Sequence, residues 1–216
     1  MPHSATRIIA IRHGETAWNR DTRIQGHLDI PLNETGRWQA ARLAQALAAR
    51  DPISTVYTSD LLRARETARA VSDATGAPLV SDERLRERNF GSFQGQTFTE
   101  IEARLPEAAQ RWRTRDPLWE PEGGESLTAM RERVQRVLDE LASAHTGEQI
   151  VLVAHGGVMD LLYRAATGQD LQAPRTWQLG NAAVNRLLWT ASQGLSLVGW
   201  ADSSHLDNEA LDESIT

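Results

Sequence analysis

The sequence contains no cysteine and no lysine, because all 23 of its basic residues are arginine. A chain without cysteine cannot form a disulfide, a thiolate nucleophile, a zinc ribbon or an iron–sulfur cluster. A chain without lysine cannot form a Schiff base with a substrate or with pyridoxal phosphate, and it lacks the lysine of a nucleotide-binding P-loop. The two absences exclude several large classes of enzyme before any motif is considered.

Long apolar runs are also missing, and no stretch approaches the roughly 18 residues that a membrane span requires. The apolar run nearest the amino terminus, Ile8–Ile11, is too short for a secretory signal. We therefore expect a cytoplasmic protein without a membrane partner.

Acidic residues gather at the end of the chain, since 201–216 contains five of them and no arginine. The whole chain has a net charge of -6, so residues 1–200 are nearly neutral. This balance provides no basic patch broad enough to indicate a nucleic-acid partner. The length of 216 residues suits one domain, which we expect over 1–200, followed by an acidic tail over 201–216.

The pattern of apolar residues predicts strands that alternate with helices. Buried strands are expected at 7–11, 54–58, 78–80 and 149–154, with a closing hairpin at 182–190 and 195–200. Helices are expected at 34–50, from Ser59 or Asp60 onward, at 125–145, and from 157 to about 166. This alternation favours a single three-layer α/β/α domain, with a mostly parallel sheet and helices on both of its faces.

Residues 81–124 interrupt the alternation with scattered glycines and prolines. Two short helices are expected within this stretch, at 97–105 and 106–115. We expect the part from 97 to 124 to form a lid that determines substrate specificity. An amphipathic helix pair that exposes arginine to solvent explains the same residues, and the sequence leaves both interpretations open.

Two of the predicted strands end in a histidine followed by glycine, at His13-Gly14 and at His155-Gly156. The carboxyl ends of parallel strands meet at one edge of a sheet, where ligands bind. Each histidine is also followed by a glycine, which lets the backbone approach a ligand closely. Each also precedes a predicted helix start, where free N–H groups favour an anion. Together with Arg12, these features predict an anion site suited to phosphate.

Four segments resemble motifs of the histidine phosphatase superfamily, in the order of that family. They are Arg12-His13-Gly14-Glu15-Thr16-Ala17-Trp18-Asn19, Thr58-Ser59-Asp60-Leu61-Leu62-Arg63-Ala64, Leu85-Arg86-Glu87-Arg88-Asn89-Phe90-Gly91 and Val153-Ala154-His155-Gly156-Gly157. Arg-His-Gly alone is a weak match, whereas four ordered motifs are specific. The family contains cofactor-dependent phosphoglycerate mutases and many phosphomonoester phosphatases. The resemblance implies a phosphoglycerate mutase-like fold and a phosphoryl-transfer reaction.

The resemblance also implies a role for each of five residues. His13 is the expected nucleophile, which attacks phosphorus to form a phosphohistidine intermediate. Arg12, Arg63 and His155 are expected to bind the oxygens of the transferred group, and the planar arginine fork suits this role because it stays charged. Glu87 is expected to protonate the leaving group and then to activate the incoming water.

Further contacts follow from the same resemblance. The expected additional phosphate-binding residues are Thr16, Asn19, Gln25, Gly26 and Gly156. The lid hypothesis, which does not come from the resemblance, names Arg88, Trp112 and Arg113. No metal and no other cofactor is expected, because the sequence contains no metal-ligand spacing.

The residues favour a hydrolase of a small phosphorylated metabolite over a mutase that uses 2,3-bisphosphoglycerate. Family mutases resemble the chain at Glu87 but have tyrosine where Phe90 stands, and they use a pocket lysine that this chain lacks. The 38 positions from Glu87 to Glu125 are also few beside the lid insertion of the mutases. The mutase remains the alternative, because arginines near Trp112 would suit a substrate carboxylate.

Two other classes of protein remain open. A non-catalytic phosphate-binding regulatory module is one, although the presence of all five expected catalytic residues argues against it. A metal-dependent hydrolase that uses His13 and His155 is the other, although no metal motif supports it. The sequence does not determine the substrate, and the closing hairpin offers an edge for a possible homodimer.

Overall fold

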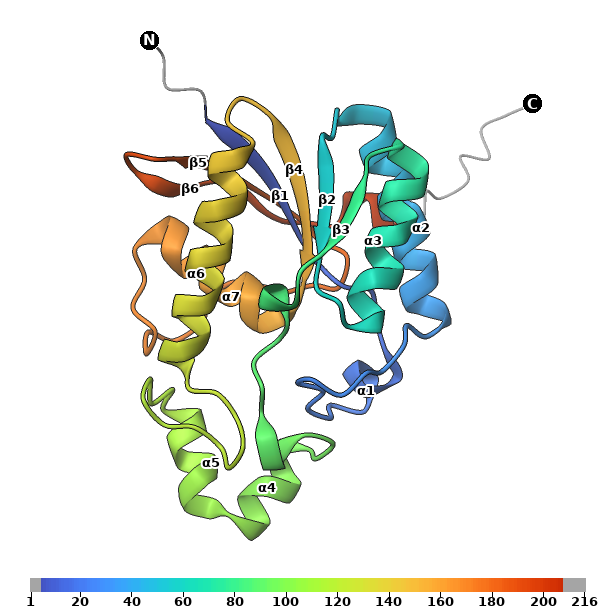
Figure 1. Ribbon diagram of the computed structural model, residues 1–216. Helices are drawn as coiled ribbons and strands as arrows, with labels where there is room; N and C mark the ends of the chain where they lie inside the picture. Colours follow the sequence, from blue (N-terminus) through green and yellow to red (C-terminus); the bar gives the residue numbers. More distant parts are fainter. Residues whose placement is uncertain (1–4, 208–216) are drawn as a thin grey trace, which may run out of the picture.

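A computed structural model describes residues 5–207 and has a central six-stranded sheet in the order β3-β2-β4-β1-β5-β6 (Figure 1). The strands are β1 (Thr6–Arg12), β2 (Thr55–Thr58), β3 (Leu79–Ser81), β4 (Gln149–Ala154), β5 (Val184–Thr190) and β6 (Gly194–Asp202). The first four strands in the sheet order pair in parallel. β5 pairs antiparallel with β1, and β6 pairs antiparallel with β5. The sheet is therefore mostly parallel.

Helices cover both faces of the sheet (Figure 1). They are α2 (Glu34–Arg50) and α3 (Leu62–Thr75) on one face, with α6 (Leu127–Ala144) and α7 (Gly156–Thr167) on the other. Alternation along β1 explains the two layers, because successive side chains of a strand point to opposite faces. Ile8 and Ala10 belong to the core cluster under α6 and α7, whereas Ile9 and Ile11 belong to the cluster under α2 and α3. The predicted three-layer α/β/α fold is confirmed.

The short elements lie near the carboxyl edge of the sheet or beyond it. They are α1 (Ala17–Arg20), α4 (Phe98–Arg104), α5 (Pro106–Arg113) and the 3-10 turns at Glu83–Leu85, Gly91–Phe93 and Ser204–Leu206. Helices α4 and α5 form a separate small lobe below the sheet, as Figure 1 shows. The lobe has its own core of Phe93, Ile101 and Ala109. Within residues 5–207, none of the helices combines the length and apolar character of a membrane span.

Two helix starts differ from the sequence prediction. α3 begins at Leu62 rather than at Ser59 or Asp60, and its N-cap Leu61 provides no side-chain hydrogen bond. α1 is a single turn capped by Thr16, so it does not begin directly after His13. Only the second expected helix start lies directly at its histidine, since His155 is the N-cap of α7.

The folded domain continues beyond residue 200, where the acidic tail was expected to begin. β6 includes Ala201 and Asp202, and the 3-10 turn Ser204–Leu206 follows it. This turn is fixed to the domain, because the His205 carbonyl accepts a hydrogen bond from Arg42 at 3.0 Å. At least 201–207 of the expected tail therefore belongs to the domain, and its remainder, 208–216, lies outside the described residues.

Candidate active site

The carboxyl ends of β1 and β4 bring two histidines together. The two strands are parallel neighbours in which Arg12 pairs with Ala154, and the next residues along the chain are His13 and His155. Their ring centroids are 5.3 Å apart. Both residues are buried, with exposed fractions of 3% for His13 and 0% for His155. The structure thus unites the two histidines that the sequence pattern places at one edge.

The tautomer of His13 is fixed by its backbone neighbour. Nδ1 lies 2.7 Å from the carbonyl oxygen of Gly14, and a carbonyl can only accept, so Nδ1 carries the proton. Nε2 is then left with a lone pair. Burial, together with the charges of Arg63 and Arg12, holds the pKa of His13 well below the usual 6.5. His13 is therefore neutral at physiological pH, in the form that can act as a nucleophile.

Backbone carbonyls hold the two arginines of the site. Arg63 donates to Gly26 and Leu28, both at 2.8 Å, and Arg12 donates to Leu179 at 2.5 Å. Arg63 is buried at the first turn of α3, with 1% exposed. These contacts use the terminal nitrogens of each guanidinium, so they fix both side chains without neutralising their charge.

Several buried nitrogens at this point have no hydrogen-bond partner among the described residues. They are Nε of Arg12, Nε of Arg63 and both ring nitrogens of His155. Buried polar groups in folded proteins nearly always have a partner, so such a cluster indicates a place for a ligand rich in acceptors. Three side chains from three different elements converge here, which fits one small oxyanion.

The electrostatics of the site point in the same direction. Burial lowers the pKa of Arg63 to about 10, and burial is also the largest cause of the lowered pKa of Arg12. Both arginines remain charged at neutral pH. Burial and the same two arginines, with a contribution from His13, hold the pKa of His155 well below its usual value. An anion bound between these groups would offset their mutual repulsion.

Glu87 is fixed at the edge of this cluster by two backbone N–H groups. Oε2 accepts from Gly157 at 3.0 Å, and Oε1 accepts from Arg88 at 2.8 Å. Residue 157 must be glycine for this contact, because a Cβ atom there would overlap Oε1 of Glu87. The ring of His27 also donates from Nε2 to the Glu87 carbonyl at 2.8 Å. The carboxyl group is therefore positioned from both sides.

Thr16, Asn19 and Gln25 form a small polar network next to His13. The Thr16 hydroxyl caps α1 by accepting from the Asn19 N–H at 3.1 Å, and it lies 3.0 Å from Oε1 of Gln25. Both amide side chains use their oxygens in these contacts, because Asn19 Oδ1 also accepts from the Thr16 N–H at 3.0 Å. The amide N–H groups of Asn19 and Gln25 stay available for a phosphate oxygen. The expected phosphate contacts of all three residues remain predictions.

The two glycines expected to contact phosphate have distinct positions. Gly26 has φ of +49° and presents its carbonyl to Arg63, so its visible contribution is to orient that arginine. Gly156 is the first residue of α7, directly after His155, where helix N–H groups are free of intrahelical partners. A phosphate contact of either residue remains a prediction.

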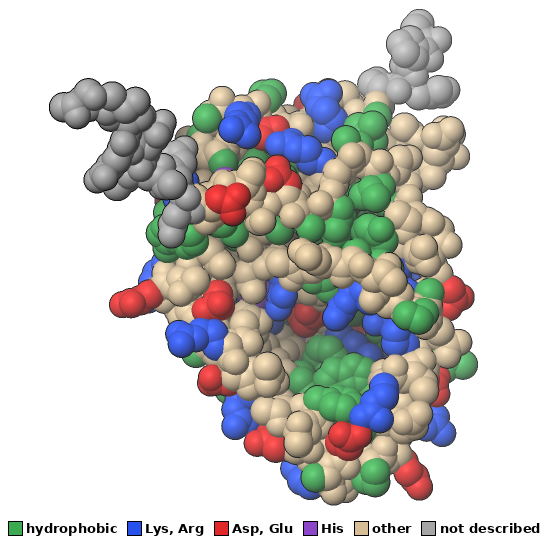
Figure 2. Space-filling view, turned by 180° about the vertical axis from the view of Figure 1, so that it is seen from behind, with side chains coloured by type: hydrophobic (Ala, Val, Ile, Leu, Met, Phe, Trp, Pro, Cys, Tyr) green, Lys and Arg blue, Asp and Glu red, His purple; other side chains and the backbone are tan. Residues whose placement is uncertain are grey.

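A cleft of about 920 Å³ opens above this cluster and reaches Arg12, Glu87 and Gly156. One wall is aromatic and comes from Phe90, Phe98 and Trp112. Figure 2 shows a hollow in which hydrophobic side chains gather between arginines. This combination suits a ligand that has an anionic end and a less polar remainder.

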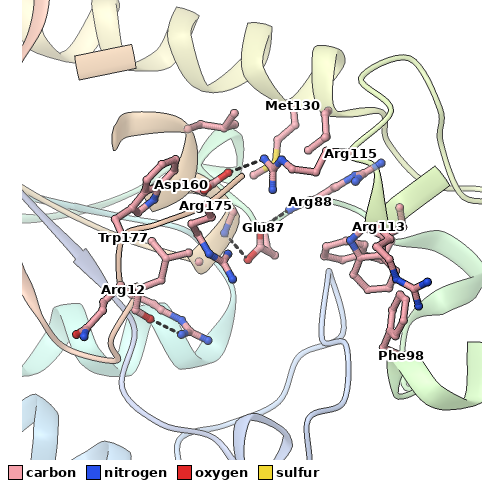
Figure 3. Close-up of a pocket in the computed structure, with 18 of the residues that line it drawn as sticks. Arg12, Glu87, Arg88, Phe98, Arg113, Arg115, Met130, Asp160, Arg175 and Trp177 are labelled. Carbon is pink, nitrogen blue, oxygen red and sulfur yellow. Dashed lines mark hydrogen bonds and ion pairs between the residues drawn. The ribbon is translucent and has the colours of Figure 1, made fainter. Parts of the chain in front are cut away.

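The three expected lid residues all line the cleft, but they contribute in different ways. Figure 3 labels two of them, Arg88 and Arg113. Arg88 is 3% exposed and donates to the backbone carbonyls of Glu125 and Trp119, so it anchors the base of the lobe. Trp112 stacks in the aromatic cluster, with its ring 5.3 Å from that of Phe90. Arg113 is half exposed and pairs with Glu102 at the rim.

Sequence reasoning missed several side chains that the structure brings to the site. Arg175 and Trp177 line the cleft from the loop between α7 and β5, and Asp160 lines it from α7. Asn181, in the same loop, donates from Nδ2 to the His13 carbonyl at 2.8 Å. No periodic pattern or motif marks this loop, so only the apolar face of α7 could have indicated that Asp160 is buried.

Acidic and histidine side chains do not form a metal site in the part of the chain that the structure describes. Among residues 5–207, no group of three or more His, Asp or Glu residues could hold a metal ion. The positive charge near His13 comes instead from Arg12 and Arg63.

Comparison with known proteins identifies the family. The sequence matches the family model of the histidine phosphatase superfamily (branch 1) over residues 8–203. The chain belongs to this superfamily. The match includes the strand ends, Glu87 and the α4–α5 lobe, so it covers the whole site described above.

The named relatives of this chain include a phosphatase and a protein named for its likeness to a mutase. Phosphoglycerate mutase-like protein 4 of Arabidopsis thaliana is 39% identical over 202 residues, which are 93% of this chain and 86% of that protein. A metal-independent phosphoserine phosphatase of the same plant is 37% identical over 205 residues, 94% of this chain and 84% of that protein.

A solved structure agrees with the fold of this histidine phosphatase. A mycobacterial glucosyl-3-phosphoglycerate phosphatase complexed with VO3 has a TM-score of 0.79 and 36% identity, covering 91% of this chain and 99% of that one. These findings confirm the predicted superfamily, the phosphoglycerate mutase-like fold and the hydrolysis of phosphomonoesters of small metabolites as the reaction class.

Proposed function

We propose that this histidine phosphatase hydrolyses phosphomonoesters of small metabolites through a phosphohistidine formed on His13. The observation that supports it most strongly is the cluster of unpartnered buried nitrogens on Arg12, Arg63 and His155, next to a neutral histidine. A phosphoryl group has three equatorial oxygens in its transition state, and the three side chains offer one donor set for each of them.

In the first step, Nε2 of His13 attacks phosphorus in line with the ester bond. The bond between phosphorus and the ester oxygen breaks, and Glu87 gives a proton to that oxygen. The hydrogen bond that Nδ1–H of His13 donates to the Gly14 carbonyl keeps the reactive tautomer in place throughout. Arg12 and Arg63 stabilise the charge on the equatorial oxygens, because they stay protonated and are fixed before substrate binds.

In the second step, water attacks phosphorus on the side opposite the bond to His13. Glu87, now a carboxylate, takes a proton from that water, and the nitrogen–phosphorus bond breaks. Inorganic phosphate leaves and the neutral histidine is restored. Glu87 suits both steps because the N–H groups of Gly157 and Arg88 hold its two oxygens at the cleft.

The reaction needs no metal in this scheme, because two arginines and His155 supply the positive charge and hydrogen bonds that a metal supplies elsewhere. The relative described as a metal-independent phosphoserine phosphatase supports this view. A purified preparation should therefore release phosphate from p-nitrophenyl phosphate and from a panel of metabolite phosphates at the same rate with and without EDTA. Vanadate, which mimics five-coordinate phosphorus, should inhibit. Activity that EDTA removes and a metal ion restores would contradict the mechanism.

The lobe of α4 and α5 is the proposed lid, with residues 97–124 contacting the leaving group. Trp112 and Arg113 face the cleft from this lobe, and Arg88 ties its base to the backbone at Glu125 and Trp119. An aromatic wall contributes contact area without demanding one particular substrate. The lid therefore adjusts the preference among leaving groups, while the histidine cluster carries out the chemistry.

The alternative function is a cofactor-dependent phosphoglycerate mutase. One relative is named as a phosphoglycerate mutase-like protein, which supports considering it. A mutase must shield the phosphohistidine from water and return the phosphoryl group to a second hydroxyl. Incubation of 3-phosphoglycerate with catalytic 2,3-bisphosphoglycerate separates the two reactions. The hydrolase releases inorganic phosphate, whereas a mutase would yield 2-phosphoglycerate. A non-catalytic regulatory module would bind phosphate and produce neither.

We also propose that the protein acts in the cytoplasm and forms a homodimer through the outer strand of its sheet. β6 is an edge strand on which Leu197 and Val198 are 38% and 58% exposed, and such an edge can pair with a second copy. Residues 1–200 are nearly neutral, so their charge gives no reason to propose a nucleic-acid or membrane partner. Light scattering during size-exclusion chromatography should report twice the mass of one 24.0 kDa chain.

A further inference from the structure

Five arginines line the cleft, and four of them already have partners. Arg12 and Arg88 donate to backbone carbonyls, at Leu179 and Glu125 respectively. The other two are held by carboxylates. Arg113 pairs with Glu102 at the rim, and Arg115 pairs with the buried Asp160 at 2.7 Å.

Arg175 is the exception among the cleft arginines. It forms no ion pair or hydrogen bond with any of residues 5–207, and its side chain is exposed in the cleft. In Figure 3 it lies beside Arg12 and Glu87, on the wall opposite Arg113 and Phe98. Its charge therefore faces the space that a leaving group would fill, and no protein carboxylate is bound to it.

Arg175 has a like charge on each of two sides. Its charge contributes to the lowered pKa of Arg12 on one side and of Arg115 on the other. Like charges held this close repel each other, and a bound anion removes that repulsion. The phosphoryl group itself has the buried nitrogens of Arg12, Arg63 and His155, so Arg175 is left for a different negative group.

The segment that presents Arg175 is attached to the catalytic cluster. Leu179, four residues further on, accepts the hydrogen bond from Arg12, and Trp177 stacks on Tyr163 of α7 with ring centroids 4.1 Å apart. Arg175 therefore stands on a loop whose position is fixed relative to the transferred phosphoryl group. A fixed distance between two positive sites selects ligands with two negative groups.

We propose that Arg175 is a specificity-determining residue that binds a second anionic group, a carboxylate or a second phosphate, on the leaving group of the substrate. The proposal rests on the phosphomonoesterase activity proposed above and adds the class of substrate. That class is a phosphorylated metabolite with a second negative charge on its organic part. Arginine suits this role because its fork binds either group in a bidentate way.

Two matched pairs of substrates test the proposal. 3-Phosphoglycerate differs from glycerol 3-phosphate by a carboxylate in place of a hydroxymethyl group, and fructose 1,6-bisphosphate differs from fructose 6-phosphate by a second phosphate. Arg175→Gln should lower kcat/KM about fivefold to tenfold for the doubly anionic member of at least one pair, because the contact is charged but exposed to solvent. Glycerol 3-phosphate and fructose 6-phosphate should change less than twofold. The pair that responds identifies the second anion.

Two further variants control for charge and for folding. Arg175→Lys retains the charge and should recover part of the lost preference. Arg69→Gln removes an exposed arginine of α3, away from the cleft, and should leave every substrate unchanged. An equal loss for both members of each pair, or an equal response to Arg69→Gln, would overturn the role of Arg175. If the wild-type protein hydrolyses neither p-nitrophenyl phosphate nor any of the four substrates, the proposed function is overturned as well.

Discussion

The phosphate-binding floor of the site and the wall that faces the leaving group are built differently. On the floor, His13, Arg63 and His155 are at most 3% exposed, and backbone carbonyls hold two of them. On the wall, Arg113 has a side chain that is 52% exposed and is held by another exposed side chain. Backbone contacts hold the floor and do not depend on the identity of neighbouring side chains. The position of Arg113 in the wall depends on another side chain, so a substitution there can change it.

This difference assigns separate tasks to the two regions. A buried and fixed set of charges stabilises a transition state without reorganising, so the floor should determine the rate of the chemical step. A half-buried aromatic wall with exposed arginines such as Arg113 gives weaker contacts that differ among leaving groups, so it should determine selectivity. Substitutions in the two regions should therefore differ both in size and in kind.

The largest effect is expected from His13→Ala. Removal of the nucleophile should lower kcat for p-nitrophenyl phosphate by at least about 10⁴-fold, because the variant lacks the atom on which the covalent intermediate is proposed to form. Thermal unfolding of the variant should remain cooperative, which separates loss of chemistry from loss of fold. Appreciable residual turnover in a folded variant would contradict the assignment of His13.

A smaller effect is expected from Glu87→Gln and from Gly157→Ala, which acts on the same carboxylate. Either change should lower kcat about 10²- to 10⁴-fold for an alkyl phosphate, since each removes or displaces the proton donor. p-Nitrophenyl phosphate should be affected less in its first step, because its leaving group departs without a proton. An equal loss for both substrates in single-turnover measurements would argue against a general acid at this position.

On the wall, Trp112→Ala and Arg113→Ala should change selectivity rather than rate. We expect the ratio of kcat/KM between a bulky aromatic phosphate and glycerol 3-phosphate to change about threefold to tenfold, the size of an aromatic contact. The kcat for the small substrate should change little. Unchanged relative rates across a substrate panel for both variants would remove the basis for the lid.

The smallest effect concerns stability and pH. Because the folded-state pKa values of His13 and His155 lie well below 6.5, the unfolded chain takes up protons first as the pH falls through 6.5. The free energy of unfolding should therefore fall with decreasing pH, by up to about 2.7 kcal/mol per pH unit for two histidines. Urea unfolding at pH 7.5, 6.5 and 5.5 measures this slope. Burial also lowers the pKa values of His27 and His205, so His13→Ala should remove the contribution of one histidine, which is less than half of the slope. A stability that does not change over this range would contradict the burial of neutral histidines.

The strand ends explain why the floor could be predicted from the sequence. An apolar strand followed directly by His13 or His155 places the side chain at a known edge of a parallel sheet. Arg63 is expected from the resemblance of 58–64 to a family motif, and the structure places it just after β2, at the first turn of α3. Backbone periodicity determines the positions of the two histidines, so one sequence is sufficient to find them.

Trp112 and Arg113 of the wall were expected from the sequence, but Arg175 could not be, because long-range contacts bring it to the cleft. Arg175 belongs to a loop without periodicity, and its neighbour in space, Arg115, is 60 positions earlier in the chain. Gly157 shows the same limit on a smaller scale. Its sequence context indicates a helix start, but only the structure shows that a larger residue would displace Glu87.

The central claim, a phosphohistidine on His13, can be tested directly. Rapid acid-free quenching of the enzyme during turnover, followed by peptide mass spectrometry under alkaline conditions, should find one phosphoryl group on the peptide that contains His13. The same peptide should carry no phosphate in His13→Ala, and none should appear on the peptide containing His155. Phosphate on another residue would contradict the account. Steady turnover by the wild-type protein without any phosphorylated peptide would contradict it as well.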